Sequence, residues 1–157
     1  MEKNKVYFTS DLHFGHENVL RFDNRPFASV DEMDAELVRR WNNKVGKGDL
    51  VYVLGDFIWK TRNDEAPELI KNLNGQIILI KGNHDRFLHN AKAKNALSGI
   101  KDYDDIVVTL EDGSTKRCIL SHFLYRCTIA TDIKGFICMV IPILLMRLIL
   151  KLMLPEA

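Results

Sequence analysis

The chain has 157 residues, of which 46% are hydrophobic and 27% charged, and its formal net charge is +1. This composition is typical of one soluble globular domain, and the small net charge argues against a polyanion-binding surface such as a nucleic-acid site. Three cysteines without a CxxC pair, and a start without an apolar signal-peptide core, favour a reducing, cytoplasmic setting.

Five segments with regular patterns follow one another in the first half of the chain. Lys5–Ser10 is rich in β-branched and aromatic residues and predicts a strand. Apolar residues at helical spacing predict a helix over Asp31–Lys44. Leu50–Leu54 is a continuous apolar run, typical of a strand buried on both faces. Asp64–Asn72, with a proline in its first turn, predicts a second helix, and Gln76–Ile80 predicts another buried strand.

A hairpin is predicted further along the chain. Ile106–Leu110 and Lys116–Leu120 flank the turn sequence EDGST. The alternation of strands and helices before it predicts an α/β fold in layers, with the hairpin added.

Polar clusters follow the predicted strands. They are DLHFGH, GDF, GNHD and SH, and they contain four of the five histidines. Because ligands bind beyond the carboxyl ends of the strands in open α/β sheets, these clusters are expected to meet at one edge. The candidate site residues in them are Asp11, His13, Asp56, Asn83, His84, Asp85 and His122.

The residue types in these clusters indicate a divalent metal site. Carboxylate, imidazole and carboxamide groups suit Mn, Fe or Zn, and the clusters contain no cysteine, which argues against a structural zinc site. Asp11 and His13 are two residues apart, so on an extended segment they point to one side. One carboxylate such as Asp56 can give an oxygen to each of two ions. Two ions can clamp a phosphate and lower the pKa of a bridging water.

The motifs D-x-H, G-D, G-N-H-D and S-H, in this order over about residues 5–123, resemble the calcineurin-like metallophosphoesterases. FTSDLHFGHENVLRFDNRPF is similar to the small bacterial and phage-type members. The resemblance implies a four-layer α/β/β/α sandwich. It also implies hydrolysis of a phosphomono- or diester, or of a nucleotide, by a hydroxide that bridges two divalent ions, with Mn favoured.

The resemblance also implies a role for each motif residue. Asp11 and His13 would bind the first metal, Asn83 and His122 the second, and Asp56 would bridge them. His84 would be a phosphate contact or general acid, oriented by Asp85.

Each motif alone has a plainer interpretation. Asp11 and His13 are compatible with a strand end, Asp56 after Gly55 with a common turn, and His122 with a hydrogen-bonded polar residue. GNHD is the most specific motif, because Asn-His-Asp has no packing purpose after a buried strand.

Three further residues are candidate substrate contacts: His16, Arg21 and Arg25. His16 contacts a substrate phosphate or caps the helix that follows it. The two arginines suit phosphate, although a solvated or ion-paired loop arginine is the plainer interpretation. Trp59 is interpreted as a packing residue.

The composition changes after residue 123. Of the 21 acidic residues, 19 lie in residues 1–123, and from residue 135 the chain reads GFICMVIPILLMRLILKLML. The resemblance implies a later G-H-x-H motif with one ligand for each metal, but no histidine follows His122.

A shifted reading frame accounts for the missing motif. Some codon choices for Cys138–Ile143 spell Met-His-Gly-His-Thr-His when they are read from the last base of the preceding codon. The glycine is forced because methionine has one codon. Each histidine needs one particular third base. The hypothesis is therefore an incomplete metallophosphoesterase domain over 1–123, an out-of-frame apolar tail over 124–157, and impaired activity. It also predicts loss of the strands that flank the motif.

The alternative is a genuine tail that anchors a non-catalytic metal- or phosphate-binding domain to a membrane or partner. Pro142, Arg147 and Lys151 argue against a membrane span.

Overall fold

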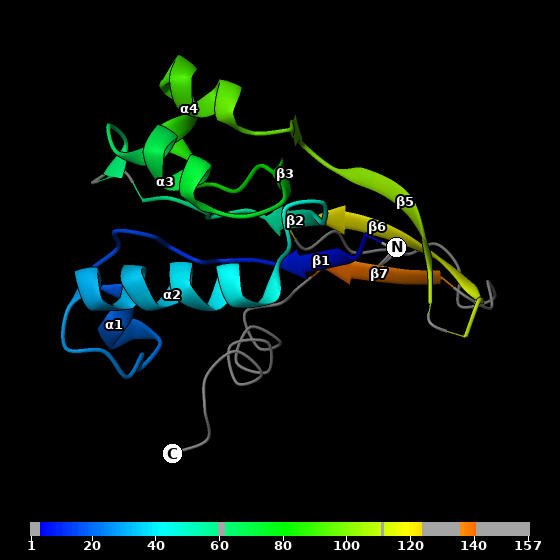
Figure 1. Ribbon diagram of the computed structural model, residues 1–157, viewed down its shortest axis with the longest axis horizontal. Coiled ribbons are helices and arrows are strands. Elements are labelled where there is room, and N and C mark those ends of the chain that lie inside the picture. The colour runs from blue at the N-terminus through cyan, green and yellow to red at the C-terminus, as the bar shows by residue number, and fades with distance from the viewer. Residues whose placement is uncertain (1–3, 60–61, 111, 124–135, 141–157) are drawn as a thin grey trace.

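The fold is taken from a computed structural model that describes residues 4–59, 62–110 and 112–123, and the backbone of 136–140. A parallel sheet lies at the centre (Figure 1). Its strands run in the order β1 (Val6–Thr9), β2 (Leu50–Leu54), β3 (Gln76–Ile80) and β4 (Gly99–Lys101). Leu50 pairs with Val6 on one side and with Gln76 on the other, so the first three strands start level. The loops that leave their carboxyl ends therefore emerge at one edge.

Helices cover one face of this sheet. They are α1 (Val19–Phe22), α2 (Val30–Lys44), α3 (Ala66–Asn72) and α4 (Ala91–Ala96), with a 3-10 helix η2 (Arg86–His89) before α4. The predicted long helix is confirmed as α2. The Ser29 side chain caps its start by accepting a hydrogen bond from the Glu32 N–H. Met33, Leu37 and Trp41, four residues apart, turn one face of α2 into the core.

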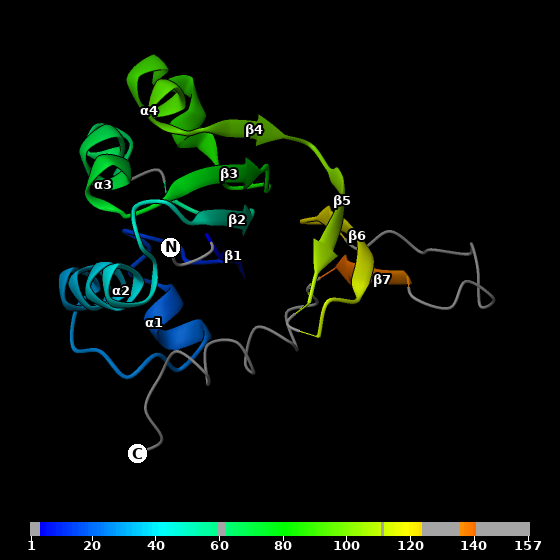
Figure 2. The same cartoon turned by 45° about the vertical axis from the view of Figure 1, so that its right-hand side comes forward.

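A second sheet packs on the other face. It consists of β5 (Asp104–Thr109), β6 (Thr115–Ser121) and β7 (Phe136–Val140); β5 is antiparallel to β6, and β7 is parallel to it. Cys118 and Leu120 on β6 pack against Tyr52, Leu54 and Ile80 of the first sheet. Figure 2 shows the central sheet between the helices and this second sheet. The described residues thus form three successive layers of the predicted α/β/β/α sandwich, and the predicted fold class is confirmed.

Several elements differ from the sequence predictions. The strands β2 and β3 have the predicted bounds, whereas β4, α1, η2 and α4 were not predicted because each is too short for a clear periodicity. β7 lies inside the segment interpreted as an out-of-frame tail. The expected loss of strands there is therefore wrong for 136–140, where five apolar residues pair with β6. The rest of 124–157, which follows the proposed frame boundary at residue 123, lies outside the described residues.

None of the helices within the described ranges is long and apolar enough to cross a membrane.

The packing of the core between the helices and the central sheet can be tested by its effect on stability. Leu79 of β3 is fully buried, so Leu79→Ala is expected to lower the free energy of unfolding by about 2–5 kcal/mol in urea titrations. Val107→Ala on the exposed side of β5 is the control, because Val107 is 66% exposed and little apolar burial is lost there. Equal losses in the two variants would contradict the described packing.

Candidate metal centre

The predicted site residues meet at the carboxyl edge of the central sheet. Asp11 and His13 follow β1, Asp56 follows β2, and the loop after β3 carries Asn83 to Asp85. His122 directly follows β6, so the second sheet delivers it to the same place. One ligand atom from each of Asp11, Asp56 and His122 lies within 4.8 Å of the others. This arrangement could hold a metal ion.

The two oxygens of Asp56 face two different groups of ligands. Its Oδ2 lies 3.9 Å from Nε2 of His13, which is also 3.9 Å from Oδ1 of Asp11. Its Oδ1 lies 3.6 Å from Nε2 of His122, which is 3.0 Å from Oδ1 of Asn83. Asp56 therefore stands between an Asp-His pair and an Asn-His pair. A carboxylate that bridged two ions would take such a position.

Three of these residues have a left-handed backbone. The φ angles of Asp11, His13 and Asp56 are 52°, 55° and 51°. Within the described ranges, only one other non-glycine residue, Asn24, has a positive φ. Residues with side chains adopt this region rarely, and such strain gathers at functional sites. The strain is therefore concentrated on the predicted ligands.

Two glycines allow the ligand loops to come this close. A Cβ on Gly82 would collide with the backbone nitrogen and Oδ1 of Asp56, and a Cβ on Gly55 would collide with the ring of His122. Gly55 also has a φ of +84°, which glycine adopts without steric cost. The loops after β2 and β3 can therefore pack backbone against backbone.

The ring of His122 shows that the residues fit a cation. Its Nδ1 lies 2.9 Å from the carbonyl oxygen of Leu54, which can only accept, so Nδ1 carries the proton. In the neutral ring the Nε2 lone pair then faces two further acceptors, the oxygens of Asn83 and Asp56. Three acceptors directed at one another need a positive charge between them, which either a proton on Nε2 or a metal ion would supply. A divalent ion meets that need with the oxygen and nitrogen ligands it prefers.

His13 is held in the form that binds metals. Burial lowers its pKa to about 3, with further lowering by the positive charge of Arg25. The imidazole is therefore neutral near pH 7 and has a free lone pair. Its buried Nδ1 has no hydrogen-bond partner among the described residues. Burial likewise raises the pKa of Asp11, so its carboxylate gains from a nearby cation.

The carboxylate of Asp85 joins two ligand loops. It accepts hydrogen bonds from the backbone N–H groups of Asp56 at 3.0 Å, Phe57 at 2.8 Å and Gly82 at 2.7 Å. None of its described hydrogen bonds reaches the His84 ring. The structure thus assigns Asp85 to the backbone around Asp56, in place of the predicted orientation of His84.

The side chain of Arg25 lies beneath the ligand loop. The side chain is 2% exposed, and its guanidinium donates to the carbonyl oxygens of Asp11 and Leu12, both at 2.9 Å, while Asp23 balances its charge at 3.2 Å. Arg25 therefore supports the backbone of the strained loop, and this buried position does not match the predicted substrate contact.

The other two candidate substrate contacts differ in position. Arg21 is exposed and donates to the side chain of Asn18 at 3.1 Å, so its substrate role stays a prediction. His16 is buried beside the ligands, with its ring centroid 5.1 Å from that of His13. Burial lowers the pKa of His16, which favours the neutral ring.

Trp59, which the sequence interpretation assigned to packing, borders this site. Its ring stacks on His16 at 3.8 Å between centroids and lies 4.6 Å from the ring of His84. No motif marks Trp59, although its place three residues after Asp56 in the loop after β2 is a possible signal.

The family model for calcineurin-like phosphoesterases matches residues 4–136. The chain belongs to this family. Membership confirms the sequence resemblance and supports metal-dependent phosphoester chemistry in general. The match also runs beyond residue 123, while the predicted domain boundary at that residue stays a prediction.

Relatives of this chain include proteins without a described activity. An uncharacterized protein of Methanocaldococcus jannaschii is 48% identical over 88 residues, which cover 55% of this chain and 50% of that protein. The Gene 66 protein of Mycobacterium phage D29 is 34% identical over 130 residues, covering 76% of this chain and 64% of the phage protein. The alignments thus span about half to two thirds of these relatives.

A solved structure supports the same fold. The crystal structure of a protein of unknown function from Aquifex aeolicus has a TM-score of 0.59 and 28% identity, covering 82% of this chain and 66% of that one.

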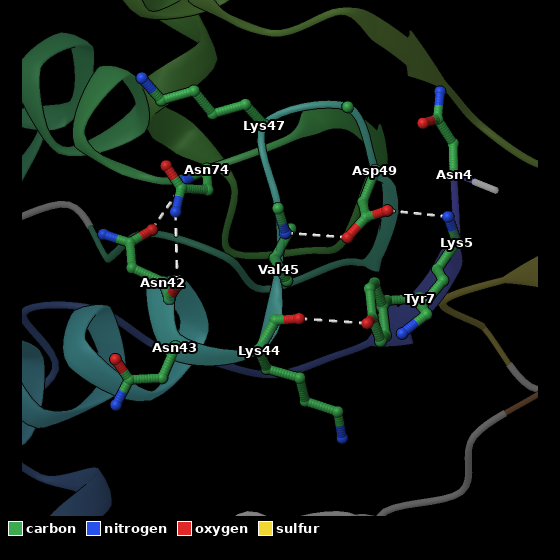
Figure 3. A pocket seen from close by; sticks show the side chains of 12 residues that line it. Asn4, Lys5, Tyr7, Asn42, Asn43, Lys44, Val45, Lys47, Asp49 and Asn74 are labelled. Carbon is green, nitrogen blue, oxygen red and sulfur yellow. Dashed lines mark hydrogen bonds between the residues drawn. The ribbon is translucent and has the colours of Figure 1, made fainter. Parts of the chain in front are cut away.

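A polar pocket lies at the opposite edge of the central sheet, near the end of α2 (Figure 3). Its volume is about 520 Å³, and Lys5, Tyr7, Asn42 and Asp49 contribute to its wall. Both oxygens of Asp49 accept backbone N–H groups, from Lys5 and Gly46. The pocket contains none of the candidate ligands and takes no part in the metal site.

Replacement of Asp56 tests the metal centre. Asp56→Asn is expected to weaken Mn²⁺ binding by about tenfold to a hundredfold or more in calorimetric titrations, since even the loss of a second-shell partner costs that much. Asp64→Asn is the matched control, because Asp64 is exposed and lies outside the ligand set. Equal affinity in both variants would show that Asp56 is no ligand.

Replacement of Arg25 tests the support beneath the loop. Arg25→Lys is expected to lower the free energy of unfolding by about 1–3 kcal/mol and to weaken Mn²⁺ binding, because lysine cannot serve both carbonyl oxygens as the guanidinium fork does. Thermal unfolding without metal and titration with Mn²⁺ measure the two effects. Arg21→Lys, on an exposed arginine, should change neither the stability nor the Mn²⁺ affinity. An Arg25→Lys variant with unchanged stability and affinity would contradict the supporting role of Arg25.

Proposed function

We propose that this chain hydrolyses a small phosphoester, a phosphomono- or diester or a nucleotide, at a centre of two divalent ions with Mn²⁺ favoured. The observation that carries the proposal is the position of Asp56, whose two oxygens face two separate ligand groups from a strained backbone. Asp11 and His13 would hold one ion, and Asn83 and His122 the other. Bound ions would supply Lewis acidity for the phosphoryl oxygens and a water of lowered pKa.

The residues of this chain contribute orientation and proton transfer. Two hydrogen bonds fix Asp56. Its backbone N–H donates to the Asp85 carboxylate, and its side-chain Oδ1 accepts from the backbone N–H of His84 at 2.9 Å. His84 is half-buried, with its ring 6.2 Å from that of His13. From this place its imidazole would contact a phosphoryl oxygen or donate a proton to the leaving group. Arg21 and His16 are proposed to contribute to substrate binding.

We further propose that the site of this chain is incomplete. No histidine follows His122, so the two ligands expected from a G-H-x-H motif are missing from the candidate set. With one ligand fewer, each ion would bind more weakly, and turnover would need high Mn²⁺ concentrations. The proposed reading-frame shift accounts for this loss.

Turnover of bis(p-nitrophenyl) phosphate with added Mn²⁺ tests the activity. The wild-type chain is expected to release p-nitrophenol and Asp56→Asn to abolish the release, because the shared ligand is lost. Asp64→Asn should retain it. Bound Mn²⁺ without turnover in the wild-type chain would instead support the non-catalytic metal-binding alternative.

The gene sequence tests the reading-frame proposal. The codons for residues 137–143 should spell Gly-His-x-His in the shifted frame, and a protein made in that frame should bind Mn²⁺ more tightly and turn over faster. Other third bases at the two histidine positions would refute the frame shift while leaving the activity proposal in place.

A further inference from the structure

Trp59 sits among three imidazoles at the border of the metal centre. Its ring is nearly parallel to that of His16, at 7° and 3.8 Å, and inclined by 50° to that of His84 at 4.6 Å. The ring of His13 approaches its edge at 6.2 Å. The indole thus contacts the rings of both His16 and His84.

The backbone holds Trp59 in this place. Its N–H donates to the carbonyl oxygen of Phe14 at 2.8 Å, and Phe14 N–H donates to Phe57 at 3.0 Å. Phe14 and Ile58 form a parallel bridge between the two loops. Phe14 and Phe57 are fully buried, so this pairing rests on the core. The indole is therefore attached to the same rigid pair of loops that carries Asp11, His13 and Asp56.

The two imidazoles beside Trp59 have few other fixed contacts. The described hydrogen bonds of His84 use its backbone N–H and carbonyl oxygen, so the direction of its ring depends on ring packing. The buried Nδ1 of His16 has no partner among the described residues. An imidazole without a hydrogen bond can rotate unless neighbouring rings restrict it. The ring of Trp59 lies nearer to each of these two imidazoles than the ring of His13 does, so Trp59 provides the closest restriction for both.

We propose that Trp59 is a positioning residue, which holds the His84 imidazole toward the leaving-group oxygen and shields His16 and His84 from solvent. The catalytic part of this inference rests on the proposed function. In hydrolysis the water oxygen bonds to phosphorus, and the bond from phosphorus to the leaving oxygen breaks with its electron pair on that oxygen. His84 then supplies the proton that this oxygen takes up, the attacking water loses a proton to solvent, and His84 takes one back from solvent.

Two aryl diesters separate positioning from a merely structural role. p-Nitrophenolate leaves without a proton, whereas phenolate, with its higher pKa, benefits from a donated one. Trp59→Leu is therefore expected to lower kcat for a phenyl phosphodiester by about 100-fold, the cost of a small misplacement of a reacting group, and to lower it much less for bis(p-nitrophenyl) phosphate. Trp59→Phe keeps a ring and should fall between Trp59→Leu and the wild type.

Phe22→Leu is the matched control. The Phe22 ring also approaches His16, at 6.4 Å, but it is 69% exposed and makes no described contact with His84. Phe22→Leu should leave the ratio of kcat for the phenyl diester to kcat for bis(p-nitrophenyl) phosphate unchanged. Equal losses on both diesters in Trp59→Leu would overturn the positioning role. If Trp59→Leu fails to fold, Trp59→Phe must show the same selective loss to a smaller degree.

A second measurement needs no turnover. Diethyl pyrocarbonate modifies accessible, uncharged imidazoles, and mass spectrometry of the full chain locates each modified histidine. Trp59→Leu is expected to accelerate the modification of His84 and His16 several-fold, whereas Phe22→Leu leaves the rate at His84 unchanged. Unchanged rates in Trp59→Leu would refute the inference. If the wild-type chain turns over neither diester, the proposed function fails, and these rates alone decide whether Trp59 holds the two rings.

Discussion

The contact on which the metal centre depends is the carboxylate of Asp85 on three backbone N–H groups. Two of these groups belong to the loop after β2 and one to the loop after β3. The carboxylate is nearly buried, and burial raises its pKa while the three hydrogen bonds act against that rise. A buried acceptor of this kind is stable only when its hydrogen bonds are made. The loops are thereby locked together, and Asp56 is locked between them.

This contact is one of two that support the strained backbone of the candidate ligands. A left-handed residue with a side chain costs about 1–2 kcal/mol, and three of the candidate ligands have that conformation. The Arg25 guanidinium beneath Asp11 and Leu12 stabilises the first loop, and Asp85 stabilises the second. The core beneath both loops, with Phe14, Phe57 and Phe87 fully buried, prevents them from relaxing.

The long-range order of the site was predictable because simple patterns encode it. The apolar runs of β2 and β3 have the predicted bounds, and ligands that follow parallel strands must share an edge. The short elements were not predictable in the same way. The three residues of β4 and the four of α1 are stabilised by tertiary contacts that local periodicity does not express. β7 shows a related effect, since its apolar residues form a strand by pairing with the edge strand β6.

The sequence by itself determined the layered α/β fold, the ligand types and their convergence, because these follow from residue chemistry and from the direction of the strands. Only the tertiary structure decided the roles of the charged and aromatic neighbours. Asp85 bonds to backbone, Arg25 lies under the loop, and Trp59 lies among the imidazoles. A side chain's partner depends on the direction in which it leaves a folded backbone. That direction is set by packing and hydrogen bonds between segments far apart in the chain, which no local pattern records.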